Sequence, residues 1–399
     1  MKKISIRYIY GILLLCTTIP VRAQGQKENE VKRFSPISTA VPSLSIAPDA
    51  RGGGMGDNGV ANGSDIASQY WNPAKYAFNY SKAGMGLSYT PWLRQLVNDI
   101  ALAYMSGFYK MGNNDNQALG ASLRYFTLGE IPLYMSGANN EIPYNYLNPY
   151  EMAVDLSYSR KLSENYSMAV AFRYIRSDMS DQSDEMMPGN SFAADVAGYV
   201  EKYVFLGNTE SLWTLGFNIS NIGTKISYDG GATNQFIPTT LRIGSGLLYP
   251  LDDYNRLGFY LDLSKYLVPT PPIKTGTSQE ENDIYEKAKT EYNNTSFMRG
   301  IFRSFNDAPG GLSEELKEIN ISLGAEYSYN EQFFLRGGYY YESPDKGTRQ
   351  YFSFGAGFRM SALQLDAAYL ISTVPSNPLD QTLRISLSFD MDGIKNLFK

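Results

Sequence analysis

Most of the chain, from residue 83 to residue 389, repeats one pattern of apolar and polar positions. Runs of roughly 8–11 residues alternate an apolar residue with a small or polar one, and a turn-rich segment follows each run. In one clear run, residues 152–159, Met, Val, Leu and Tyr alternate with Ala, Asp and Ser. A period of two residues is that of a β-strand with one apolar and one polar face. The pattern recurs about fourteen times and predicts an all-β chain.

Three features favour a membrane barrel over a soluble β-sandwich, whose strands also alternate. A secretory signal precedes the strands, Tyr is enriched at strand ends, and the faces opposite the apolar ones carry Gly, Ser, Arg and Asp. The connections also alternate between long ones, such as 265–317, and short ones, such as 330–332. Outer-membrane barrels have short periplasmic turns and long external loops. The sequence therefore predicts a 14-stranded antiparallel transmembrane β-barrel over residues 83–399, with both termini on the periplasmic side.

The amino-terminal part differs in kind from the strand region. A basic start, an apolar stretch over residues 9–19 and small residues before Gln24 predict a signal peptide for Sec export, residues 1–23. Residues 24–51 are interpreted as an extended arm, and residues 52–82 as a hatch (a plug) in the barrel lumen, because both are rich in Ser, Pro, Ala and Gly.

A glycine-rich piece of the predicted hatch contains the pattern G-x-G-x-x-G, from Gly54 to Gly59. This pattern indicates a dinucleotide site only between a strand and a helix. Pro48 and Asp49 lie just before it, and no βαβ context surrounds it. Tight turns of a plug account better for these glycines.

The composition excludes several classes of function. The chain has no His, and its single Cys, Cys16, lies in the predicted signal peptide. Without His there is no imidazole base and no imidazole metal ligand, so we expect no enzyme activity, no cofactor and no metal. The net charge of −5 argues against a partner that is a nucleic acid. One acidic run lacks the spacing of a calcium loop and is interpreted as a solvated external loop: Asp178, Asp181, Asp184 and Glu185.

Charges of both signs fall on the polar faces of the predicted strands. They favour either ion pairs inside the barrel, held against the plug, or an ordinary solvated lumen, and both interpretations stay open. The residues are Arg124, Arg173, Arg242, Arg384, Asp155, Asp195, Asp262, Glu326 and Asp366.

Three stretches carry a resemblance to known families. Residues Ser64–Ala74 resemble the D-A-x(5)-N-P-A hatch signature of the FadL-type outer-membrane transporters, which implies a 14-stranded barrel with an amino-terminal hatch in the lumen. Within that superfamily, Ala47–Ala61 and Phe217–Gly223 are similar to the PorV (LptO) group. The glycine-rich segment resembles the sister group PorQ as well, and the motifs alone do not separate the two.

The hatch motif itself consists of Asn72, Pro73 and Ala74. Proline fixes its own φ and biases the preceding residue toward an extended conformation. We therefore predict that Asn72 and Pro73 set a turn that docks the plug, and that their role is structural.

The resemblance to PorV proteins implies a part in the type IX secretion machinery of Bacteroidetes, at the cell outer membrane. It implies binding of the C-terminal signal domain of cargo proteins. It further implies transfer of the cargo from a translocon barrel of the SprA/Sov type to the PorU sortase and attachment complex, where the cargo is anchored to lipopolysaccharide. The sequence offers no residues for the lipid A deacylation that the name LptO suggests. The alternative is a FadL-like transporter of hydrophobic small molecules across the outer membrane.

Two external segments are the candidates for partner binding. In the longest loop, apolar residues recur at helical spacing and predict an amphipathic helix. The first external loop has an apolar tip where water is expected, which also suits an interfacial anchor. The helix could equally cap the barrel mouth. The candidate residues are Trp92, Leu93, Phe297, Met298, Ile301, Phe302 and Phe305.

Overall fold

The computed structural model describes residues 35–391, apart from 95, 96, 98, 113, 134–144, 181–185, 275, 277, 375, 376 and 378. The predicted signal peptide, residues 1–23, and the first part of the predicted arm, residues 24–34, lie outside the described residues. None of the helices in the described part is long and apolar enough to cross a membrane.

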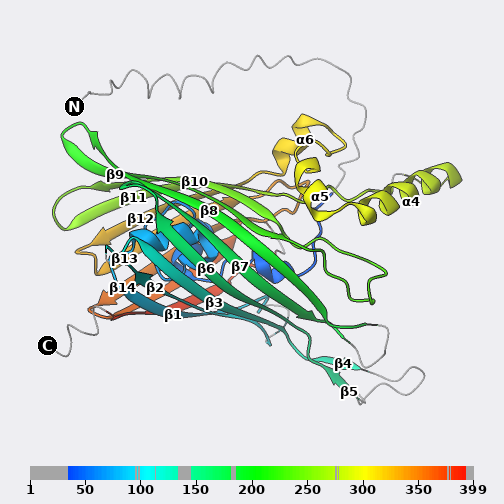
Figure 1. Ribbon diagram of the computed structural model, residues 1–399, viewed down its shortest axis with the longest axis horizontal. Helices are drawn as coiled ribbons and strands as arrows, with labels where there is room; N and C mark the ends of the chain where they lie inside the picture. Colours follow the sequence, from blue (N-terminus) through cyan, green and yellow to red (C-terminus); the bar gives the residue numbers. More distant parts are fainter. Residues whose placement is uncertain are drawn as a thin grey trace. The chain divides into compact units, whose positions relative to one another are not determined.

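Fourteen strands close into one barrel, in which every neighbouring pair is antiparallel (Figure 1). The barrel closes where β1 pairs with β16, from Gly84 opposite Asp390 to Tyr89 opposite Ile385. This confirms the predicted fourteen-stranded antiparallel barrel. In the order of the wall, the strands are β1 (Ala83–Pro91), β2 (Ile100–Met111), β3 (Gln117–Leu128), β6 (Tyr150–Lys161), β7 (Tyr166–Asp178), β8 (Gly189–Leu206), β9 (Thr209–Gly223), β10 (Thr240–Pro250), β11 (Asn255–Tyr266), β12 (Asn320–Tyr329), β13 (Phe333–Tyr341), β14 (Gln350–Met360), β15 (Leu363–Ser372) and β16 (Leu383–Asp390).

The two faces of each strand meet different surroundings, which is why the sequence alternates. In β6, Val154 and Leu156 are exposed on the outer surface, whereas Ala153, Asp155 and Ser157 are buried on the inner one. Apolar side chains that face outward and small or polar ones that face inward are typical of a barrel with lipid outside and a polar lumen.

Long and short connections lie at opposite ends of the barrel, as predicted. The short turns include 207–208 and 361–362, and the longest connection is 267–319. This loop contains three helices, α4 (Gln279–Asn294), α5 (Phe297–Arg303) and α6 (Leu312–Lys317), which lie beyond the strands at the long-loop end in Figure 1. The β3–β6 connection holds a separate two-stranded sheet that the sequence pattern did not predict, β4 (Ile131–Leu133) and β5 (Asn145–Leu147).

The amino-terminal segment fills the lumen with short helical turns (Figure 1). These are η1 (Pro42–Ser45), α2 (Ala50–Gly53), α3 (Ser68–Trp71) and η2 (Pro73–Phe78). Ala50 N–H donates to Ser386 Oγ in β16 at 2.8 Å, and Gly59 N–H donates to Asp262 in β11 at 2.8 Å. On another side, Asn72 Nδ2 donates to the carbonyl of Gly198 in β8 at 3.0 Å. Since bonds run to strands all around the wall, the segment lies inside the barrel.

Candidate functional site

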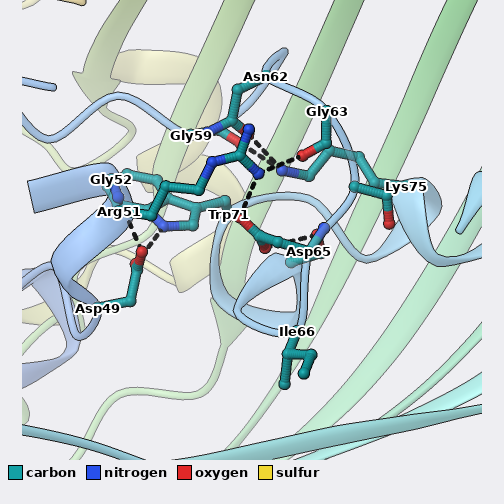
Figure 2. Close-up of polar contacts among 12 residues, drawn as sticks. Asp49, Arg51, Gly52, Gly59, Asn62, Gly63, Asp65, Ile66, Trp71 and Lys75 are labelled. Atoms are coloured by element: carbon teal, nitrogen blue, oxygen red, sulfur yellow. Dashed lines mark hydrogen bonds and ion pairs between the residues drawn. The ribbon is translucent and has the colours of Figure 1, made fainter. Parts of the chain in front are cut away.

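Trp71 is the packing centre of the glycine-rich part of the hatch. Its indole N–H donates to Asp49 at 2.7 Å, and the same carboxylate caps α2 by accepting from Gly52 N–H at 2.8 Å (Figure 2). A Cβ atom on Gly52 would lie 2.6 Å from the Trp71 ring, and one on Gly59 would also collide with it. These glycines are therefore needed for close packing on an indole ring, and the described residues before them, from residue 35 on, contain no strand such as a dinucleotide site would require.

Arg51 joins the hatch to the barrel wall through three acceptors. Its guanidinium donates to Glu326 in β12 at 3.0 and 3.2 Å, to Asp65 at 3.0 Å and to the carbonyl of Gly63 at 3.0 Å. Burial alone would lower the pKa of Arg51, but Glu326 and Asp65 raise this pKa well above its ordinary value. Arg51 is therefore a permanent cation that anchors the hatch.

Six of the nine lumen residues form ion pairs with each other or with residues of the amino-terminal segment, which favours the first of the two interpretations. The six are Arg173, Arg384, Asp155, Asp195, Glu326 and Asp366. Arg336 bonds Glu326 at 2.7 Å and Asp366 at 2.6 Å. Asp57 of the hatch forms an ion pair with Arg384. Fully desolvated charges persist in a protein only when they are paired or hydrogen-bonded in this way.

The hatch motif lies in the same network. Asn72 is fully buried, and its amide donates to the carbonyls of Val60 and Gly198, both at 3.0 Å. Its Oδ1 caps η2 by accepting from Ala74 N–H at 3.1 Å, and Pro73 occupies the first turn of η2. These contacts dock the turn on the hatch and on β8, and the structural role of the motif stays a prediction.

Two asparagines on β9 were not predicted as site residues, although they belong to the 217–223 stretch. Asn218 donates to the carbonyl of Trp71 at 3.0 Å. Asn221 has φ 60° next to a β-bulge, and its N–H donates to Asp195 at 2.8 Å. Asparagine is one of the few residues that adopt this conformation readily, and bulges re-aim side chains. The only sequence feature that could have marked them as site residues is the recurrence of Asn within this short stretch.

The candidate residues of the long external loop divide into two groups. Phe297 and Ile301 are half-buried. The inner face of α5 packs closely on Phe236, since a Cβ atom on Gly300 would lie 2.9 Å from the Phe236 ring. Met298, Phe302 and Phe305, which we call the outer stripe, are 46%, 73% and 51% exposed. The predicted helix ends at Arg303, before the last stripe residue, because Ser304 caps it with its N–H on the carbonyl of Gly300.

The other candidates lie elsewhere. Trp92 and Leu93 are half-buried in the β1–β2 connection, and Leu93 has φ 52°. Strands β13 to β16 separate this connection from the β11–β12 loop around the wall, so the two external segments are not adjacent there.

The acidic run is only partly described. Asp178 forms an ion pair with Arg176 at 3.3 Å, and Asp181, Asp184 and Glu185 lie outside the described residues. Among the described residues, no group of acidic side chains could hold a metal ion.

A second ion-pair cluster, unforeseen from the sequence, holds α6 over the barrel rim. Lys265, at the end of β11, bonds Glu315 at 3.0 Å and also Glu318. Lys346, in the β13–β14 loop, bonds Glu318 at 3.0 Å and Glu314 at 2.6 Å. We call these five residues the rim cluster. It joins the β11–β12 and β13–β14 loops at the long-loop end of the barrel.

A closed barrel with an apolar exterior and its own amino-terminal segment in the lumen defines an outer-membrane β-barrel with a hatch. Residues 27–273 match the family described as "Type IX secretion system protein PorV", and the chain belongs to this family.

The fold is also similar to that of a solved toluene transporter. The Pseudomonas putida toluene transporter TodX aligns over 86% of this chain and 98% of its own, with a TM-score of 0.50 and 9% identity. A Pseudomonas aeruginosa FadL homologue covers 90% of this chain and 99% of its own, with a TM-score of 0.44 and 13% identity. At 9% identity, the likeness to TodX shows the fold alone. No curated protein matches the chain significantly.

Proposed function

We propose that this protein binds the C-terminal signal domain of secretion cargo at the external face of the outer membrane. It takes the domain from the translocon barrel and passes it to the sortase and attachment complex, after its own export through a Sec signal peptide. Membership of the PorV family supports the secretion role. The external location of the binding surface is inferred from the structure.

The observation that carries this proposal is the contrast between a filled lumen and an apolar external surface. The cavity between the hatch and strands β1, β2, β15 and β16 has a volume of about 290 Å³. This volume suits a small molecule at most and excludes a folded domain. Cargo that passes as a folded domain must therefore contact the outside of this barrel.

The outer stripe is the strongest candidate for that contact. Met298 and Phe302 stand on the outward face of α5 and Phe305 follows its end, while the inward face packs against Phe236 and Pro269. Lys225 reinforces this packing, since its ammonium group lies 3.9 Å from the Phe236 ring centroid and donates to the carbonyl of Asn293 at 2.9 Å. Fully burying one such side chain contributes about 1.5–3 kcal/mol. A few anchors of this size suit a complex that must later release its cargo.

A triple variant tests the proposal: Met298→Ser, Phe302→Ser and Phe305→Ser. A matched control replaces Phe205, Leu251 and Tyr254 by Ser, because these are exposed apolar residues at the opposite rim. Barrel assembly is checked by heat-modifiability, and cargo secretion and co-purification of the signal domain are measured. We expect normal assembly in both, and at least about tenfold less co-purified cargo only in the stripe variant. Unchanged secretion and co-purification in the stripe variant would contradict the proposal and would show that the stripe only covers the barrel mouth.

The alternative of a transporter for hydrophobic small molecules is less well supported. Such a site needs a mainly apolar lining. The 290 Å³ cavity is lined instead by carboxylates, serines and arginines, among them Asp65, Asp366 and Arg359.

A further inference from the structure

Three arginines from the barrel wall converge near Tyr70 of the hatch. They are Arg124 of β3, Arg173 of β7 and Arg242 of β10, and all three are buried. Together with Tyr70 and Tyr104 they line one small cavity of about 10 Å³. A cavity of roughly this size holds one water-sized particle.

Only one of these arginines has carboxylate partners. Arg173 bonds Asp155 at 2.5 and 2.9 Å and Asp195 at 3.0 Å. The second oxygen of Asp155 also accepts from Ser122 at 2.9 Å, so this carboxylate is fully engaged. The ion pairs of the described residues include neither Arg124 nor Arg242.

The two unpaired cations are held by neutral groups. Arg124 donates through Nη1 to the carbonyl groups of Ser43 and Ile46, the latter at 3.0 Å. Arg242 donates to Tyr70 Oη at 3.1 Å and to Ser220 Oγ at 3.2 Å. Both guanidinium groups lie against the Tyr70 ring, at 4.8 and 5.0 Å from its centroid. Neutral acceptors satisfy these hydrogen bonds, so neither guanidinium is in direct contact with a carboxylate. Asp155 also lines the cavity, but it is paired with Arg173.

One charged donor in the cavity lacks an acceptor among the described residues. It is Nη2 of Arg124, a residue that is only 4% exposed. A guanidinium nitrogen can only donate, so Arg124 Nη2 requires an acceptor in this cavity. A buried donor without one is costly, more so when it is charged.

We propose that this cavity binds a small monovalent inorganic anion, for which chloride is the probe. Such an ion accepts hydrogen bonds from several directions and also compensates the charges of Arg124 and Arg242. A water molecule would supply the acceptor but no charge. Glu151 also lies in this region, where it accepts from Ser43 N–H at 3.0 Å, but it neither lines the cavity nor forms an ion pair with Arg124.

The anion site is a junction of three parts of the molecule. Arg124 belongs to the wall and holds the carbonyls of the segment around η1, while Tyr70 belongs to α3 of the hatch. The bound anion therefore fixes the hatch against strands β3 and β10. This inference does not depend on the secretion role.

The first test is crystallographic and uses the full chain. Crystals are grown with bromide in place of chloride, and anomalous scattering is recorded at the bromine edge. We expect an anomalous peak in the cavity within hydrogen-bond distance of Arg124 Nη2. Density without an anomalous signal would identify water and overturn the proposal.

The second test measures thermal unfolding in detergent micelles with chloride or gluconate at equal ionic strength. For the wild type we expect the midpoint to fall by roughly 2 °C or more without chloride, because a ligand that binds only the native state stabilises it. Arg124→Gln should lose this dependence, while Arg160→Gln, at an exposed position of β6, should keep it. A wild-type midpoint indifferent to chloride would contradict the proposal even if the Arg124 variant fails to fold.

Discussion

At the scale of single residues, Lys75 is the buried cation of the hatch without an ion pair among the described residues. Its ammonium group donates to the carbonyl of Gly59 at 2.8 Å and to Asn62 Oδ1 at 2.6 Å (Figure 2). Burial lowers its pKa from 10.5 to about 8, against a partial opposing effect of Asp65. The native state therefore disfavours the charged form that the unfolded chain retains.

This shift predicts how stability depends on pH. Between pH 8 and about pH 10 the unfolded chain keeps a proton on Lys75 that the native state releases, so the native state gains stability as pH rises. Relative to Lys75→Met, the free energy of unfolding should rise by at most about 1.4 kcal/mol per pH unit in this window. Below pH 8 the difference between the two proteins should be constant. Urea unfolding in micelles, followed by Trp fluorescence at several pH values, measures it, and parallel pH profiles of both proteins would refute it.

The second prediction at the residue scale concerns the stability of an Asn72 variant. Asn72→Ala leaves the carbonyls of Val60 and Gly198 and the N–H of Ala74 without their side-chain partner. Each lost buried bond costs about 1–3 kcal/mol, so we expect a loss of several kcal/mol and a lower yield of assembled barrel. Asn294→Ala, at an exposed position of α4, is the control. Wild-type stability combined with selectively lost cargo binding would instead assign Asn72 to recognition.

At the scale of elements, the rim cluster decides how firmly α6 is held. Glu318 has a fully buried side chain that accepts from Lys265, from Lys346 at 3.0 Å and from Thr270 at 3.1 Å. Glu318→Gln removes the charge that both lysines share, and breaking a buried pair costs about 3–5 kcal/mol. We expect faster hydrogen exchange in α6 and unchanged exchange in the barrel strands. Arg303→Met breaks only an exposed pair with Glu291 and should change little. Equal exchange in α6 of wild type and Glu318→Gln would show that packing alone holds this helix.

The elements also show what the sequence could predict. The strands were predictable because lipid outside and a polar lumen inside impose a period of two, as Leu156 and Asp155 illustrate. Helical spacing predicted an amphipathic α5. It could not tell that Phe297 would turn inward and Phe302 outward, because the face that packs depends on Phe236 in another loop.

At the scale of the whole molecule, the charged residues of the lumen were identifiable but their partners were not. Arg51 and Glu326 are 275 residues apart in the chain, and Asp57 and Arg384 are 327 apart. Which residues meet depends on the strand register around the entire wall and on the path of the hatch. No local pattern contains this information, so the ion pairs and the three-arginine cavity could only come from the structure.

The contacts between the hatch and β16 also constrain the order in which this protein is assembled. Ala50 and Asp57, near the beginning of the chain, bond Ser386 and Arg384 in the last strand. These bonds cannot form until the final strand has arrived, and contacts so distant in sequence form late in folding. A segment that is synthesised before every strand of the barrel is thus among the last to reach its final state, and the wall must close around it.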